Sequence, residues 1–388
     1  MSSLAPWPHY EPDEIAAVGE ILASGRVNYW TGGEGKAFER DYALHCGVKY
    51  AIAVANGTNA LELALHGLGI GPGDEVIVPA RTFIATAGAV ATRGARPVVV
   101  DVDATSLNLT AGTVAAAITV RTKAIIPVHL NGWPVDMAPL MALAAQHNLK
   151  VIEDCAQAHG AQDRGRTVGG IGDIGCFSFC QDKIISTGGE GGMVVTDDEA
   201  LFKRMWAYRD HGRDYDLAHG PKKGTGFQWM TSDFGTNWRM TESQSAIGRK
   251  QLAKLPRWLA RRRAVAGQLS AALSSFSAIQ PPAPPSHAEH AFYKYMFQLD
   301  PAALRSEWSR ERIMAALEDK GIPTRVGGCP DISREDAFRR HGFTTPLLPT
   351  AAWLENCTLM LPAHPTLSDD NVAFMTDTLR SVLKAALR

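Results

Sequence analysis

The sequence predicts an α/β fold, in which a mainly parallel sheet covered by helices is followed by a smaller α+β unit. Three observations predict it. Short apolar segments alternate with segments of helical periodicity over residues 50–153, which favours a parallel sheet. A long helical pattern follows, and beyond it a proline-rich stretch precedes a short mixed run of strands and helices. We place a large domain at residues 1–255 and a small domain at 256–388.

Each expected element follows from its local pattern. We expect strands where apolar runs end at turn residues, at 50–55, 75–79, 97–101, 123–128, 150–153, from Ile174 onward and at 193–196. We expect helices where apolar residues recur at helical spacing, at 14–24, from about Lys36, after Thr58, and at 84–94, 111–117, 137–147, 199–208 and 241–273. In the smaller unit we expect a half-exposed strand at 292–298, strands at 323–326 and 358–361, and helices at 310–320 and 369–387. Residues 209–223 read as a long polar loop.

Composition limits the class of protein. The 388 residues are 45% hydrophobic and 20% charged, which is typical of a globular protein and excludes wholesale disorder. The formal charge of −1 offers no general attraction for nucleic acid or an anionic membrane. No apolar run approaches membrane-spanning length and the first residues do not resemble a signal peptide, so we expect a cytoplasmic protein. Six scattered cysteines lack metal-site spacing, and we expect them to be reduced, with no bound metal.

One lysine follows a buried apolar run. Phe177, Ser178 and Phe179 end the run, Lys183 comes next, and a glycine-rich turn surrounds Glu190. A surface position is the usual fate of a lysine. The apolar neighbours would instead bury its stem, which favours a neutral, nucleophilic amine that can form a Schiff base with an aldehyde. Taken alone, this stretch leaves both interpretations open.

Two further stretches carry polar groups at expected strand ends. A strand, a tight turn and a helix start meet at residues 56–59, where backbone N–H groups could bind a phosphate, although an ordinary helix cap is the simpler interpretation. A buried strand also runs out into Asp154, followed by Gln157 and His159. A partly desolvated acid that stays ionised needs a cationic partner, whereas a helix N-cap would account for the aspartate without one.

Together these features match the requirements of pyridoxal 5′-phosphate (PLP). A parallel sheet brings the ends of its strands to one edge, so the helix start, Asp154, Ser178 and Lys183 should meet there. The cofactor needs an amine for its aldehyde, a carboxylate for its ring nitrogen and hydrogen-bond donors for its phosphate. Each feature alone is compatible with an ordinary structural role, but their joint occurrence favours PLP.

Several stretches, in order, resemble the DegT/DnrJ/EryC1/StrS family of PLP-dependent sugar aminotransferases. They are NGTNALELAL, GDEVIVPARTFIATAGAV, TKAIIPVHLNG, VIEDCAQAHGA, FSFCQDK with GEGG, and GTNWRMTE. The resemblance covers nearly the whole chain and implies the fold type I of aspartate aminotransferase. It implies that Lys183 is the Schiff-base lysine and the base that moves the proton, and that Asp154 pairs with the ring nitrogen.

The resemblance also implies roles for other side chains around the cofactor. Gln157 would lie near the ring hydroxyl, and Phe83 would stack on the ring. Phosphate contacts would come from Gly57, Thr58, Asn59 and Ser178 of one chain and from Asn237 of the neighbouring subunit, so a homodimer with shared active sites is implied.

The implied reaction moves an amino group from L-glutamate to a keto-sugar linked to a nucleoside diphosphate, giving an amino sugar for surface polysaccharides or secondary metabolites. His211, Arg213 and Arg239 are candidate contacts to the sugar or diphosphate, although a solvated basic loop accounts for the first two equally well. Relatives that dehydrate sugars carry histidine in place of the lysine, so Lys183 argues against that chemistry. One departure from the family pattern is an extra residue between Lys183 and Glu190.

Two other functions remain open on the sequence. Relatives that aminate a cyclitol or make an aminohydroxybenzoate resemble the family over the same stretches. A regulatory protein that keeps the fold without catalysis is disfavoured, because it would be expected to lose Lys183 or Asp154.

Overall fold

The computed structural model of the protein describes residues 4–221 and 228–388. Its centre is a seven-stranded sheet in which every strand is parallel except β9, which runs antiparallel to both neighbours. The parallel-dominated sheet predicted from the sequence is therefore confirmed. From edge to edge the strands are β1 (Tyr50–Val54), β9 (Gly192–Thr196), β8 (Ile174–Ser178), β5 (Lys150–Asp154), β4 (Thr122–Ile125), β2 (Glu75–Pro79) and β3 (Arg96–Val100).

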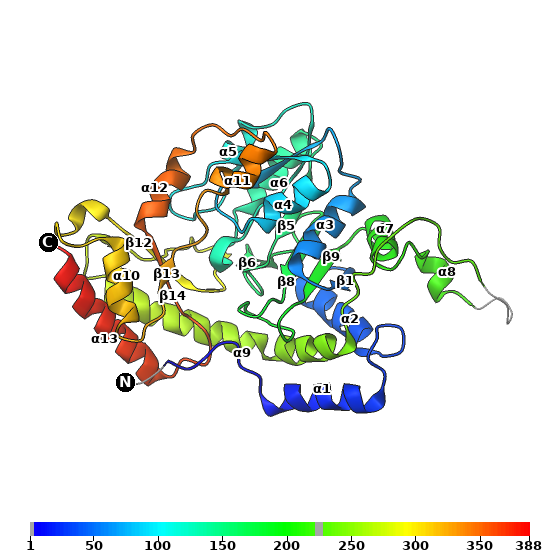
Figure 1. Ribbon diagram of the computed structural model, residues 1–388, viewed down its shortest axis with the longest axis horizontal. Helices are drawn as coiled ribbons and strands as arrows, with labels where there is room; N and C mark the ends of the chain where they lie inside the picture. Colours follow the sequence, from blue (N-terminus) through cyan, green and yellow to red (C-terminus); the bar gives the residue numbers. More distant parts are fainter. Residues whose placement is uncertain (1–3, 222–227) are drawn as a thin grey trace.

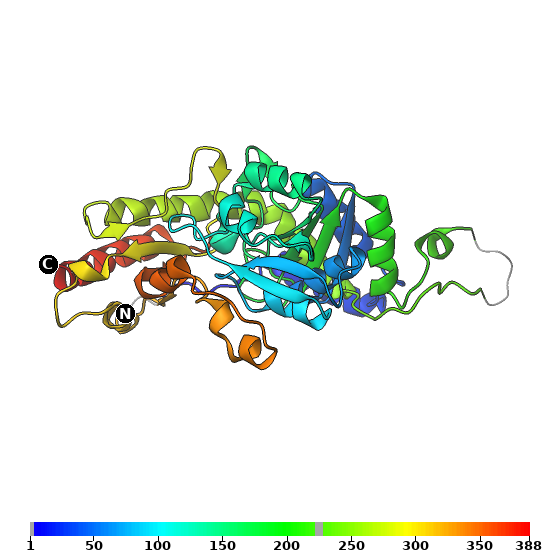
Figure 2. The same cartoon turned by 90° about the horizontal axis from the view of Figure 1, so that it is seen from above.

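Helices cover both faces of this sheet (Figures 1 and 2). One face packs against α3 (Gly57–Gly67), α4 (Ala85–Thr92) and α7 (Glu199–Arg209). The other packs against α2 (Glu34–Cys46), α5 (Ala111–Ala115), α6 (Met137–Gln146) and the first half of α9 (Glu242–Leu273), while α1 (Pro12–Ser24) lies against α9. Helical spacing explains the packing of α3, because Leu61, Ala64 and Leu65 fall on its inner face and are buried.

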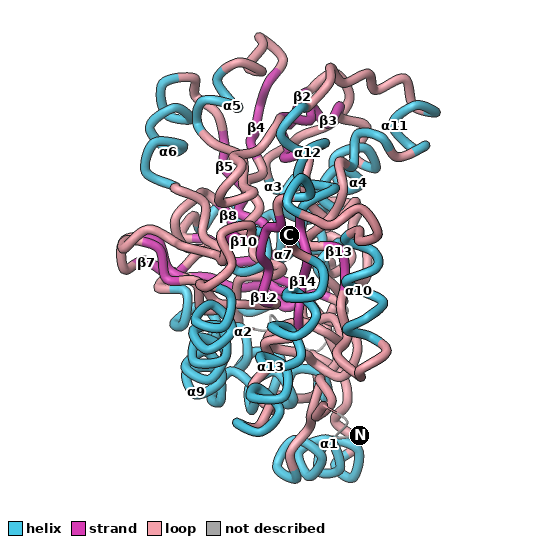
Figure 3. Tube along the Cα trace, turned by 90° about the vertical axis from the view of Figure 1, so that its left-hand side faces the viewer, coloured by secondary structure: helices cyan, strands magenta, loops and turns pink. Residues whose placement is uncertain are grey.

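The C-terminal part forms a second, antiparallel sheet of β10 (Ile279–Gln280), β12 (Tyr295–Leu299), β14 (Thr358–Leu361) and β13 (Arg325–Val326). This sheet packs on α10 (Arg310–Glu318), α13 (Asp369–Ala386) and the second half of α9 (Figure 3). Two further helices, α11 (Asp336–Arg340) and α12 (Pro349–Cys357), connect β13 to β14. A small antiparallel sheet joins β11 (Ala288–Glu289) to β6 (Gln162–Asp163) and β7 (Arg166–Thr167).

Three expectations need correction. The half-exposed strand at 292–298 is β12, which is buried throughout, because Tyr295 and Phe297 pack on the α9 side while Met296 packs into the core of the large sheet. The polar loop at 209–223 contains α8 (Tyr215–His219), because Asp214 caps it by accepting a hydrogen bond from Leu217 N; Lys222 and Lys223 lie outside the described residues. Helix α2 begins at Glu34 rather than near Lys36.

Helix α9 links the two sheets along 32 residues. Thr241 and Gln244 form a capping box at its start, where the helix at 241–273 was expected to begin, and Pro256 lies within the helix. The expected domain boundary at 255/256 falls inside this helix and stays a prediction. Among the described residues, no helix combines the length and apolar character that crossing a bilayer requires.

Candidate active site

The start of α3 provides unpaired donors at the edge of the sheet. Asn56 is the N-cap, and its side chain accepts a hydrogen bond from Asn59 N at 2.8 Å. Thr58 and Asn59 therefore lie in the first turn rather than at the cap. Within residues 4–221 and 228–388, the N–H groups of Gly57 and Thr58 have no acceptor. The helix start is capped and still keeps free N–H groups, as an anion site needs.

Gly57 and Ser178 are in close contact. A Cβ added to Gly57 would lie 2.6 Å from the Ser178 Cβ, so only glycine lets α3 approach the end of β8. The Ser178 carbonyl accepts a hydrogen bond from His159 Nε2 at 2.9 Å, and the His159 Nδ1 accepts one from the Tyr42 hydroxyl at 2.7 Å. Burial lowers the pKa of His159 to about 3, so its ring is neutral and holds Ser178 in place.

Asp154 is the last residue of β5 and is only 6% exposed. Its Oδ2 accepts a hydrogen bond from the Thr86 hydroxyl at 2.8 Å, and its Oδ1 accepts one from Ala156 N at 3.1 Å. Turns rather than a helix follow it, which excludes the N-cap interpretation. Burial raises the pKa of Asp154, despite those hydrogen bonds and the nearby charge of Lys183. The carboxylate therefore favours a cationic partner at this edge of the sheet.

Lys183 lies in the loop between β8 and β9 and is half-buried. Its Nζ stands 4.9 Å from the centre of the Tyr293 ring, and its carbonyl accepts a hydrogen bond from Trp7 Nε1 at 3.0 Å. The Tyr293 hydroxyl donates to Asp182 Oδ2. The lysine is thus held between the large sheet and the segment that leads into β12.

Other predicted residues lie around this centre. The Gln157 Oε1 accepts a hydrogen bond from Asn131 N at 2.7 Å. Phe83 is 63% exposed and Asn237 is exposed, and the contacts of these two side chains with a cofactor stay predictions.

The basic candidates form a separate group around Asp210. Arg239 pairs with the Asp210 carboxylate, and the Arg213 Nη1 lies 3.9 Å from the same group. His211 is exposed and contacts the neighbouring segment through its backbone, which donates to Thr236 O at 2.8 Å. These residues are therefore not brought into contact with Lys183 within one chain.

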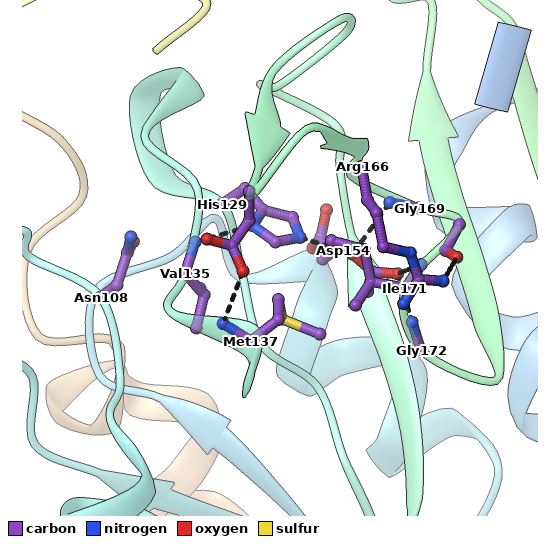
Figure 4. Close-up of polar contacts among 12 residues, drawn as sticks. Asn108, His129, Val135, Met137, Asp154, Arg166, Gly169, Ile171 and Gly172 are labelled. Atoms are coloured by element: carbon purple, nitrogen blue, oxygen red, sulfur yellow. Dashed lines mark hydrogen bonds and ion pairs between the residues drawn. The ribbon is translucent and has the colours of Figure 1, made fainter. Parts of the chain in front are cut away.

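Sequence patterns did not reveal a buried support beneath Asp154 (Figure 4). Glu153 accepts hydrogen bonds from His129 Nε2 at 3.0 Å and from the N–H groups of Gly169, Ile171 and Gly172 at 2.6–2.9 Å. Burial alone would raise the Glu153 pKa, but these donors hold it below its usual value. The backbone N–H of His129 in turn donates to the Asp154 carbonyl at 3.1 Å, so His129 and Glu153 together fix the end of β5.

Thr86 was missed as well, although its signal is readable. Thr82 and Thr86 are four residues apart, and their hydroxyls lie 2.7 Å from each other. Because the Thr86 hydroxyl donates to Asp154 Oδ2, the Thr82 hydroxyl must donate to Thr86. A threonine pair at helical spacing after a strand that ends near the acid was the available clue.

These residues fit PLP on observations of the structure itself. The glycine-only contact at Gly57 and the free N–H groups form a place for the phosphate. The buried Asp154 has no cationic hydrogen-bond partner among the described residues, and a protonated ring nitrogen would supply one. Lys183 lies near enough for its charge to act on Asp154.

Comparison with known proteins identifies the family. The model of the DegT/DnrJ/EryC1/StrS aminotransferase family matches residues 8–380. The chain belongs to this family. It is accordingly a PLP-dependent aminotransferase with the fold type I architecture expected from the sequence.

Three relatives illustrate the similarity. The chain is 40% identical over 381 residues to the UDP-N-acetyl-3-dehydro-alpha-D-glucosamine 3-aminotransferase of Acidithiobacillus ferrooxidans, covering 97% of this chain and 96% of that protein. It resembles the structure of an aminotransferase from Psychrobacter cryohalolentis, with a TM-score of 0.96, 45% identity and coverage of 98% and 99%. It also resembles 3-amino-5-hydroxybenzoic acid synthase, with a TM-score of 0.89, 31% identity and coverage of 99% and 100%.

Proposed function

We propose that this aminotransferase moves the amino group of L-glutamate to a ketone on a sugar linked to a nucleoside diphosphate. The observation that carries the proposal is the 40% identity, over 97% of the chain, to a protein named for a UDP-linked keto-sugar. The identity to the aminohydroxybenzoate synthase is lower, at 31%, so we favour the sugar.

The positions of the residues support the following roles. When bound, PLP supplies an electron sink for the carbon next to the transferred nitrogen. Asp154, held by Thr86 and by the backbone of Ala156, would keep the ring nitrogen of bound PLP protonated. Lys183 would hold the aldehyde of the cofactor and, once its amine is free, would carry the proton to and from the substrate carbon. Tyr293, whose ring centre is 4.9 Å from the Lys183 Nζ and whose hydroxyl donates to Asp182, would keep the lysine at this place.

The group around Asp210 supports binding of the diphosphate. Arg213 and Arg239 share the single carboxylate of Asp210, so this carboxylate neutralises only one of the two guanidinium charges. Arg213 is 34% exposed and its guanidinium also stacks on Trp30, with 5.0 Å to the ring centre. We assign the diphosphate to these two arginines, with His211 beside them, because planar guanidinium groups bind phosphate oxygens in pairs.

A homodimer completes the proposed site. The segment that carries α8 extends away from the body of the protein in two perpendicular views (Figures 1 and 2). Phe234, at 93% exposure, follows α8 along the chain, and exposed aromatic side chains are typical of surfaces that bind another protein. The Asn237 side chain makes no hydrogen bond within the described residues, which leaves it free to contact the partner's phosphate.

A complementation experiment tests the shared site. Lys183→Ala and Asn237→Asp chains, each inactive alone, are co-expressed with different tags. If Asn237 serves the partner, mixed dimers contain one intact site, and activity returns to about a quarter of the wild-type value by statistical pairing. Mixed dimers without activity would place Asn237 and Lys183 in the same chain's site.

The reaction is tested with purified, PLP-loaded protein. L-Glutamate alone should change the visible absorbance of the cofactor, and a UDP-linked 3-keto sugar should restore it while an amino sugar nucleotide appears by mass spectrometry. This alternation predicts ping-pong kinetics. Turnover of a keto-inositol in place of every keto-sugar nucleotide would contradict the proposal, as would full turnover by Lys183→Ala.

A further inference from the structure

A second lysine, Lys294, lies beside Lys183. It directly follows Tyr293, in the segment that leads into β12, and its Nζ is 4.9 Å from the centre of the Tyr293 ring. The Lys183 Nζ is also 4.9 Å from that centre. The two nitrogens are therefore separated by at most twice this distance. In an amino acid the nitrogen and the nearer carboxylate carbon are about 2.5 Å apart. Glutamate carries a second carboxylate farther along its side chain, so a donor whose nitrogen stands at Lys183 presents a carboxylate at two distances within this upper bound.

The backbone of Lys294 is fixed from two sides. Asn131 accepts from its N–H at 3.0 Å and donates to its carbonyl at 2.9 Å, while the Asn131 N–H donates to Gln157. Arg262 of α9 donates to the Tyr293 carbonyl at 3.0 Å. The segment that carries Lys294 is thus attached both to the edge of the large sheet and to the long helix, so little ordering is needed before it can bind a ligand.

The ammonium group of Lys294 lacks an acceptor. Its side chain is 21% exposed, and the carboxylate oxygen that faces it, Asp182 Oδ2, is 4.0 Å away and already accepts from the Tyr293 hydroxyl. Within the described residues the ammonium group forms no hydrogen bond. Burial lowers the pKa of Lys294, and the charges of Arg262 and Lys183 lower it further while Asp182 opposes them. A buried cation with unused donors is costly unless an anion joins it.

We propose that Lys294 binds a carboxylate of the amino donor while the donor's nitrogen takes the place of the Lys183 amine. This inference rests on the proposed function, in which an amino acid supplies the nitrogen. The sugar substrate also carries an anion, its diphosphate, but we assign that group to the arginines at Asp210. Lys294 thereby acts in one half of the reaction and not in the other.

The test follows the two halves separately with PLP-loaded, full-length protein. L-Glutamate alone is titrated into wild type, Lys294→Met and Lys294→Arg, and the change in cofactor absorbance gives the apparent dissociation constant. Loss of a hydrogen-bonded charge should weaken glutamate binding about 10- to 100-fold in Lys294→Met, with partial recovery in Lys294→Arg. Glutarate, which has two carboxylates and no amine, is titrated calorimetrically into the same proteins. Its binding should weaken in Lys294→Met in parallel with that of glutamate. Lys320→Met removes an exposed lysine and serves as the matched control.

A further variant separates carboxylate binding from a purely structural role of Lys294. Asp182→Asn tests whether Lys294 only pairs with Asp182. Because Asp182 also supports Tyr293 beside Lys183, the readout for this variant is glutarate, which has no amine to react there, and a loss of glutarate binding equal to that of Lys294→Met would overturn the inference. Unchanged binding of glutamate and glutarate in Lys294→Met would also overturn the inference. A loss of affinity confined to the nucleotide sugar in the second half-reaction would overturn it as well. If wild type shows no response to glutamate or to other amino acids, the proposed function fails instead, and glutarate binding still decides the role of Lys294.

Discussion

Replacing Gly57 with alanine tests the contact between α3 and β8. The added Cβ would lie 2.6 Å from the Ser178 Cβ and 3.2 Å from its Cα. Carbon atoms pack at about 3.5–4.0 Å, so the helix start must move by about 1 Å. Such overpacking costs about 1–3 kcal/mol, and it separates the N–H groups of α3 from the Ser178 hydroxyl. If that cost falls on the bound state, PLP affinity drops by about 5- to 150-fold.

The assay combines two measurements on one protein. Apoprotein is titrated with PLP by absorbance, and its free energy of unfolding is measured in urea. Gly267→Ala is the matched control, because Gly267 is a helical, exposed glycine whose added Cβ meets nothing within 4 Å. This control should gain up to about 1 kcal/mol from helix propensity and keep its PLP affinity. A Gly57→Ala protein that behaves like the control in both measurements would refute the assignment of this corner to the phosphate.

Three more changes have defined outcomes. Asp154→Asn should weaken PLP binding at least tenfold. Because the pKa of Asp154 is raised in the folded protein, the wild type loses stability as the pH rises through that pKa, so the variant apoprotein should be as stable as wild type or more stable in urea at pH 8. A variant apoprotein that is less stable than wild type would contradict this expectation. The pKa of His159 is about 3 in the folded wild type, so between pH 6.5 and 4.5 this histidine binds a proton only in the unfolded chain, and the wild type loses stability as the pH falls. His159→Gln should reduce this loss of stability, and equal pH profiles for the two proteins would exclude the explanation. Glu153→Gln places an amide N–H next to backbone N–H donors that have now lost an acceptor, and it should lower the free energy of unfolding by about 2–4 kcal/mol more than the control Glu20→Gln at an exposed position. A loss no larger than that of the control would contradict the supporting role of Glu153.

Local patterns were sufficient to predict the sheet and the position of its acid. Alternating strands and helices in the first half have strong periodicity, and Asp154 comes two residues after the apolar pair Val151 and Ile152, so its position at a strand end could be predicted. The burial of β12 could not be predicted from the sequence, because it depends on Met296 packing into the core of the large sheet. That contact joins segments that are far apart in the sequence. The helix α8 was missed because five residues give too little periodicity.

The site divides in the same way. Lys183, Ser178 and the helix start at Gly57 lie next to strong strand or turn signals. The supporting roles of His129, Glu153 and His159 could not be predicted, although Glu153 and His159 lie in the same stretch as Asp154, because these residues act through partners 16 to 24 residues away in the sequence. Lys294 belongs with these, since it reaches the neighbourhood of Lys183 only through the clamps from Asn131 and Arg262. Long-range contacts of this kind leave no spacing that a single sequence can display.

The antiparallel direction of β9 has a consequence for how insertions can be accommodated in this protein family. The lysine loop leaves the sheet at Ser178 and returns directly in the adjoining β9, without a crossover helix. Just before β9 the loop turns at Gly188 and Gly189, whose φ angles of 89° and 124° suit glycine. An inserted residue in this loop lengthens the connection and leaves the pairing of β8 with β9 unchanged. Evolution can therefore vary the length of this connection while the reactive amine keeps its distance from the strand that positions it.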